Sequence, residues 1–96
     1  MMDRVLLEFL TEMIGTAVFL SVIIFTGNAI MIGLTLTVVI YIGQKYSNAH
    51  FNPAVNFMML MSNKISTKQF ITETVAQILG AFLAVLLYKN RTQINL

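Results

Sequence analysis

Apolar residues along the chain form three long runs and one short run, separated by small clusters of polar residues. The long runs cover residues 5–26, 29–46 and 67–89. Each holds about the 17 to 25 residues that a helix needs to cross the core of a bilayer. Almost nothing polar lies between the first two runs, so they predict an antiparallel pair of helices with a very short connection.

The short run, residues 53–62, starts at the only proline and breaks this pattern. At a helical rise of about 1.5 Å per residue it is about 15 Å long, half of a bilayer core of roughly 30 Å, so it cannot span. Asn52 is a favoured helix N-cap, and Pro53 suits the first helical position, where a missing N–H costs nothing. The polar stretch SNKIS follows and predicts an end that lies in water.

These features together predict a re-entrant segment over residues 47–62. Residues 47–51 descend from one membrane surface to mid-depth, and the half-helix from Pro53 returns to the same surface. Backbone outside a helix is tolerated at that depth only where protein buries it or where it lines an aqueous cavity. An Asn-Pro pair alone is more often a plain turn, but neither a turn nor an interfacial helix explains the uniformly apolar residues that follow.

Composition places the chain in a membrane. Of its 96 residues, 57% are hydrophobic and only 10% are charged, and the mean hydropathy is +0.80. We therefore expect an all-α, multi-pass integral membrane protein with a single domain over residues 1–96. The chain has six basic and four acidic residues, a net charge of +2, and the basic residues stand at segment ends. Their placement favours anchoring at a membrane surface over binding of nucleic acid.

Side chains that could carry catalytic chemistry are few. There is no cysteine, and His50 has no second histidine at ligand spacing, so neither a disulfide nor a metal site is expected. No nucleophile, base and orienting group stand together, which makes an enzyme the least favoured class and predicts no cofactor. His50 is interpreted with equal weight as a structural residue and as part of a pore lining.

Carboxylates inside spanning helices are costly and normally have partners. Glu12 is interpreted as a structural acceptor for N–H groups of the re-entrant loop, in preference to a proton relay. Glu73 lies one turn into the last long run and is expected to reach the lipid headgroups. The same run carries small residues at four-residue spacing, which predict a close helix-packing face. These residues are Ala76, Gly80 and Ala84.

Three stretches of the chain resemble the aquaporin and aquaglyceroporin channels, the major intrinsic proteins. The stretch AHFNPAVNF, residues 49–57, is similar to the first signature loop of that family. TEMIGTAVFL, residues 11–20, is similar to its first helix, and VAQILGAFLA, residues 75–84, to its third. A family member has two such halves, inverted relative to each other, each with three spanning helices and one half-helix carrying Asn-Pro-Ala. The resemblance covers nearly the whole chain but only half of a member.

The resemblance implies half of an aquaporin fold, with three transmembrane helices and one re-entrant half-helix. It assigns Asn52, Pro53 and Ala54 to the pore motif, and it makes Glu12 and Gln77 structural polar residues. The function that it implies is passive transport of water, and of small neutral solutes such as glycerol, across a lipid bilayer.

The half-helix needs a counterpart, because alone it leaves its N-terminal N–H groups and the Asn52 amide facing hydrocarbon. The simplest counterpart is a second copy inserted upside down, which makes an antiparallel homodimer; family members gather further as tetramers. Four basic residues on one side against two on the other permit dual insertion. They are Arg4, Lys45, Lys64 and Lys68 against Lys89 and Arg91. The alternatives are a half-unit that needs a heterologous partner or modulates a full-length channel, and a small permeabilising or scaffold protein.

The expected constriction departs from the family pattern. In the family an Arg typically follows the second Asn-Pro-Ala, whereas Val55 stands at that place here, as in first halves. The usual aromatic of the second helix falls on Ile32, and its counterpart is near Ile40. We expect each mouth of the pore to be lined by Ile32, Ile40, Ala49 and Val55 of the two copies, with His50 as a further candidate. Water and glycerol both remain candidate solutes.

Overall fold

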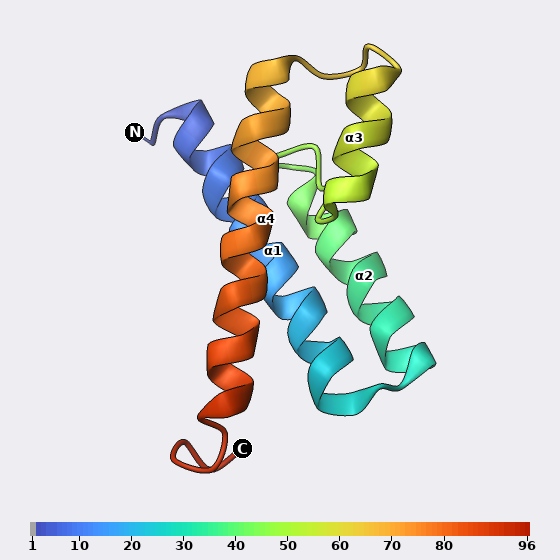
Figure 1. Ribbon diagram of the computed structural model, residues 1–96. Coiled ribbons are helices and arrows are strands. Elements are labelled where there is room, and N and C mark those ends of the chain that lie inside the picture. Colours follow the sequence, from blue (N-terminus) through green and yellow to red (C-terminus); the bar gives the residue numbers. More distant parts are fainter. Residues whose placement is uncertain (1) are drawn as a thin grey trace.

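The computed structural model describes residues 2–96, which fold into helices joined by short connections (Figure 1). The helices are α1 (Arg4–Thr26), α2 (Ala29–Gly43), α3 (Pro53–Met61) and α4 (Thr67–Lys89). α1 and α4 have 23 residues each and are apolar and long enough to cross a membrane. α2 has 15 residues and α3 has 9. The all-helical architecture predicted from the sequence is confirmed.

A tight turn joins α1 to α2. Gly27 has φ 58°, in the left-handed region, and its N–H donates to the carbonyl oxygen of Ile23 at 3.0 Å. Glycine adopts this conformation without steric cost, which is why it commonly follows a helix end. Asn28 then caps α2, and its Oδ1 accepts a hydrogen bond from the Met31 N–H at 3.0 Å. The predicted hairpin therefore needs only two residues outside its helices.

α2 is shorter than the sequence predicts. The apolar pattern continues to residue 46, but the helix ends at Gly43. The N–H groups of Tyr46 and Ser47 both donate to the Gly43 carbonyl oxygen, at 2.9 and 3.0 Å. These two bonds tighten the last turn and direct the chain into the loop before α3, where hydropathy alone predicts more helix.

The closest packing of the fold is between α1 and α4. Ala76, Gly80 and Ala84 of α4 are buried, so the predicted face of small residues is confirmed. A Cβ atom placed on Gly80 would stand 2.5 Å from the carbonyl oxygen of Met13 on α1. The two backbones are therefore in direct contact, as is common where small residues promote helix association in membranes.

The interior of the molecule is polar and its surface is largely apolar, the reverse of a water-soluble domain. The buried polar side chains come from α1, α3 and α4. They are Glu12, Thr16, Asn56, Glu73 and Gln77. Many large apolar side chains of α1, α2 and α4 point outward instead, with Ile78 and Phe82 of α4 more than half exposed. Such a surface suits lipid, where apolar side chains on the outside cost nothing.

Replacement of Gly80 by Ala is expected to destabilise the fold, because the added methyl group forces α1 and α4 apart. Overpacking of this kind costs about 1–3 kcal/mol of the free energy of unfolding. Gly33→Ala on α2 is the matched control, since a Cβ at Gly33 meets nothing within 4 Å. The control is expected to be neutral or stabilising by about 0.5–1 kcal/mol. Unfolding by denaturing detergent, followed by circular dichroism, measures both, and equal stabilities would contradict the close contact.

Candidate functional site

Asn52 and Pro53 start α3, as the sequence predicts. Asn52 has an extended backbone (φ −159°, ψ 120°), and its Oδ1 accepts a hydrogen bond from the Ala54 N–H at 2.8 Å. Asn52, Pro53 and Ala54 are all exposed. Within residues 2–96 the side-chain NH₂ group of Asn52 has no acceptor, so it is free to donate to a group outside this chain.

The loop before α3 holds a backbone conformation that its residues disfavour. Ala49 and Phe51, on either side of His50, each have φ 52°, in the left-handed region. Residues other than glycine in such regions cost about 1–3 kcal/mol each and persist only where surrounding structure imposes them. The side chains around this loop therefore have to supply its stability.

Glu12 is the main acceptor for this loop. It is fully buried, and its Oε1 accepts from the Phe51 N–H at 2.9 Å while its Oε2 accepts from the His50 N–H at 3.3 Å. The hydroxyl of Ser47 donates to the same Oε2 at 2.6 Å and accepts from the Ala49 N–H at 2.9 Å. The N–H groups of His50 and Phe51 thus donate to one carboxylate directly, and that of Ala49 is linked to it through the Ser47 hydroxyl.

A second carboxylate joins the loop to α3 and α4. Glu73 is fully buried; its Oε2 accepts from Nδ2 of Asn48 at 2.6 Å, and its Oε1 lies 2.9 Å from Nδ1 of His50. The side-chain oxygen of Asn56 lies 3.1 Å from the same His50 nitrogen. Because both neighbours of Nδ1 are acceptors, we assign a proton to Nδ1 of His50. The structural interpretation of His50 is thereby supported.

Gln77 connects the two carboxylate clusters. Its Nε2 donates to Oε1 of Glu12 at 2.9 Å and to Oδ1 of Asn56 at 3.2 Å. Nδ2 of Asn56 donates in return to Oε1 of Gln77 at 2.7 Å and to Oγ1 of Thr74 at 3.1 Å. Among the buried side-chain nitrogen and oxygen atoms of residues 2–96, Oγ1 of Thr16 alone lacks a partner. The network satisfies its own members, as buried polar groups require.

Sequence reasoning missed two fully buried members of this network, Glu73 and Asn56. Glu73 was expected at the headgroups, which is wrong, because it is fully buried against the loop. Its position carried a usable signal: residues four apart share a helix face, and Glu73 stands four residues before Gln77 on the face that carries the buried Ala76 and Gly80. Asn56 carried no comparable signal, since an amide one turn into an isolated half-helix faces either protein or solvent.

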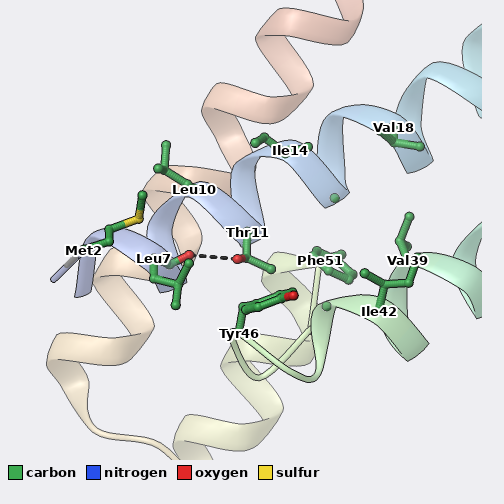
Figure 2. A pocket seen from close by; sticks show the side chains of 12 residues that line it. Met2, Leu7, Leu10, Thr11, Ile14, Val18, Val39, Ile42, Tyr46 and Phe51 are labelled. Atoms are coloured by element: carbon green, nitrogen blue, oxygen red, sulfur yellow. Dashed lines mark hydrogen bonds between the residues drawn. The ribbon is translucent and has the colours of Figure 1, made fainter. Parts of the chain in front are cut away.

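Phe51 anchors the loop between α1 and α2. Its side chain is 2% exposed. A Cβ atom on Gly15 of α1 would clash with its ring, and one on Gly43 of α2 would stand 2.7 Å from it. Both glycines therefore leave room for the ring, which lies between the two helices at one wall of an apolar cavity of about 380 Å³, with Tyr46 and Thr11 nearby (Figure 2).

The residues predicted to form the constriction lie apart in this chain. Ile32 and Ile40 of α2 and Val55 of α3 are partly exposed. α2 and α3 do not pack against each other, so one copy does not bring these side chains together. Ala49 is only 4% exposed and packs beside Gly43. Its methyl group therefore faces the inside of this chain. If Ala49 lines the pore, it has to do so with its backbone.

The sequence profile described as major intrinsic protein matches residues 4–95. The chain belongs to the major intrinsic protein family. This confirms the resemblance carried by the Asn-Pro-Ala loop and its flanking helices. Together with two helices of spanning length, membership makes the chain an integral membrane protein, as the composition predicts. Major intrinsic proteins are channels rather than enzymes.

Curated relatives in this family match the chain over part of their own length. Glycerol uptake facilitator protein-like 6 of Lactiplantibacillus plantarum is 38% identical over 86 residues, which cover 80% of this chain and 40% of that protein. Nodulin-26 of Glycine max is 41% identical over 64 residues, which cover 67% of this chain and 24% of that protein. Aquaporin Z of Brucella melitensis is 38% identical over 60 residues, which cover 62% of this chain and 26% of that protein. The chain thus spans less than half the length of these relatives, and no solved structure matches it.

Replacement of Glu12 by Gln is expected to loosen the loop before α3. Both oxygens of the carboxylate accept hydrogen bonds. The amide of glutamine has only one oxygen, so its NH₂ group faces the donors that the other oxygen accepted from. A hydrogen bond to a charged group contributes about 1.5–3 kcal/mol, so amide exchange at Phe51 is expected to accelerate by about tenfold or more. Hydrogen exchange of the protein in detergent micelles measures this. Glu8→Gln, one turn earlier on α1, is the control, and an equal effect of both variants would contradict the assigned role of Glu12.

Proposed function

We propose that this chain is half of a passive membrane channel for water and small neutral solutes, and that an inverted copy of the same chain supplies the other half. One observation carries the proposal. The exposed Asn52 stands at the start of a helix of 9 residues that rises only about 13 Å. Figure 1 places this start well inside the length of α4 rather than at an end of the molecule. At that depth its free donors need a polar partner or water.

An inverted copy fits this requirement. It brings a second Asn52 and a second α3 N-terminus to the first from the opposite surface, around a two-fold axis in the membrane plane. The starts of α1 and α4 and the end of α3 lie at one end of the molecule, and the turn between α1 and α2 lies at the other (Figure 1). Basic residues occur at both ends, which permits insertion in both directions.

The mechanism follows from the groups that meet at the centre. Each Asn52 offers its free NH₂ donors to the oxygen of a passing molecule, and each α3 N-terminus adds about half a positive charge. Exclusion of cations and protons by such helix ends is the known behaviour of aquaporin-type pores and is carried over here by family membership. Water and uncharged alcohols can accept these hydrogen bonds, whereas cations are repelled.

The selectivity proposal rests on Val55. No arginine follows Asn-Pro-Ala in this chain, so a homodimer has an apolar Val55 at each mouth, with Ile32 and Ile40 on α2 as further lining. Glu12 accepts from the N–H groups of the loop, and no backbone N–H of residues 2–96 donates to the carbonyl oxygens of residues 49–51, which we expect to act as acceptors along one vestibule. A mouth of this kind is apolar and wider than one narrowed by a cationic side chain.

Stopped-flow shrinkage of liposomes that hold this protein alone tests the channel. We expect fast shrinkage without proton entry, read from an internal pH-sensitive dye. Asn52→Asp should slow it by about tenfold or more, because the substitution removes the NH₂ donors offered to the passing molecule and places a charge at mid-membrane. Asn63→Asp, in the turn after α3, is the control and should leave the rate unchanged. Val55→Arg should slow glycerol more than water.

Shrinkage no faster than that of empty liposomes, with the protein inserted and folded, would contradict the homomeric channel. It would favour the alternative, in which the half-unit needs a heterologous partner or modulates a full-length channel. Nonselective leakage of the dye would instead favour a permeabilising protein.

Single cysteines test the inverted arrangement, because the native chain has none. In an antiparallel dimer the two Ala54 positions meet near mid-membrane, whereas the two Asn63 positions lie at opposite surfaces. A short bifunctional thiol reagent is therefore expected to link Ala54→Cys into dimers and to leave Asn63→Cys monomeric on a denaturing gel. Dimers from Asn63→Cys would show a parallel arrangement and contradict the proposal.

A further inference from the structure

We propose that the groove between the first turns of α1 and α4 binds the headgroup of a membrane phospholipid, with the phosphodiester between Arg4 and Lys68 and a headgroup N–H or O–H donor on Glu8. The groove has a volume of about 280 Å³. Its lining combines two cations, one carboxylate, two neutral polar side chains and one apolar one. They are Arg4, Lys68, Glu8, Gln69, Thr72 and Val5.

The charges in this groove have no ion-pair partners among the residues that the structure describes. Among residues 2–96 the ion pair is between His50 and Glu73, so Arg4 and Lys68 are both unpaired and both exposed. With Glu8 included, the groove carries one net positive charge, which matches the single negative charge of a phosphodiester. The planar guanidinium of Arg4 suits two phosphate oxygens at once, and the ammonium of Lys68 adds a point charge.

The position of the groove is that of lipid headgroups. α1 begins at Arg4 and α4 at Thr67, and both helices are long and apolar enough to cross the membrane. Their first turns lie at the same end of the molecule (Figure 1). The positive ends of the two helix dipoles therefore point the same way and favour an anionic group beside them.

An apolar track below the groove supplies a place for an acyl chain. Residues spaced three and four apart lie on one helix face. Continuing from Lys68 and Thr72 along α4, this spacing meets only large apolar side chains, all between 41% and 59% exposed. They are Val75, Leu79, Phe82 and Leu86. The cations of the groove match the phosphate of a phospholipid, and the apolar face below them matches its acyl chain. A soluble phosphate would use the cations alone.

Glu8 determines which headgroup fits. Its carboxylate can accept a hydrogen bond from the ammonium of phosphatidylethanolamine or the hydroxyls of phosphatidylglycerol. Phosphatidylcholine has no donor to offer. The groove is therefore expected to prefer the first two lipids over phosphatidylcholine, and Glu8 rather than the cations should carry that preference.

Native mass spectrometry of the full chain in detergent, titrated with each of the three lipids, tests the site. Phosphatidylethanolamine and phosphatidylglycerol should bind more tightly than phosphatidylcholine. The double variant Arg4→Gln, Lys68→Gln should weaken their binding by about tenfold or more, since each basic residue near a membrane surface contributes a substantial attraction. The control Lys45→Gln, Lys64→Gln removes the same charge outside the groove and should bind as the native chain does.

Glu8→Gln should retain binding but reduce the preference over phosphatidylcholine, because the amide oxygen is an uncharged and weaker acceptor than the carboxylate. This variant keeps the proposal open to refutation even if the double variant folds poorly. Inorganic phosphate at millimolar concentration should not displace the lipid. Equal losses in the groove and control variants, displacement by inorganic phosphate, or an unchanged lipid preference in Glu8→Gln would each overturn the proposal.

Discussion

The carboxylate of Glu12, buried in α1, is the interaction on which the rest of this structure depends. Backbone N–H groups outside a helix need acceptors, and inside a protein or a bilayer no bulk water provides them. Glu12 takes the N–H groups of His50 and Phe51 directly and that of Ala49 through Ser47. With those bonds made, the left-handed conformations of Ala49 and Phe51 become sustainable.

Close backbone contacts put Glu12 in reach of its partners. Gly80 lets α4 touch α1, and this approach places Gln77 at 2.9 Å from the Glu12 carboxylate. Gly15 and Gly43 make room for the ring of Phe51, which fixes the loop from its apolar side. The small residues and the polar network are thus parts of one arrangement. The network can be compact because the glycines at these contacts carry no side chains that would hold the helices and the loop apart.

Sequence reasoning recovered the features that depend on local pattern. The apolar run lengths gave the long helices, and Asn52 with Pro53 marked the start of α3 because capping chemistry is local. The early end of α2 escaped prediction, since it depends on a turn onto the Gly43 carbonyl that hydropathy does not register. Glu73 was misplaced for a related reason. Its distance from the helix end suggested the membrane surface, whereas its partners, Asn48 and His50, come from a loop more than 20 residues away.

The hydrogen-bond network around Glu12 and Glu73 is complete within one chain, which bears on how copies come together in a membrane. Within residues 2–96 the loop and its anchors find their hydrogen-bond partners in the same chain, whereas the side-chain NH₂ group of Asn52 has no acceptor there. A single chain therefore supplies the groups that hold the loop, and what calls for a partner is the Asn52 amide and the N-terminus of α3. Under the inverted pairing proposed above, pores then form by encounter between chains that are already folded.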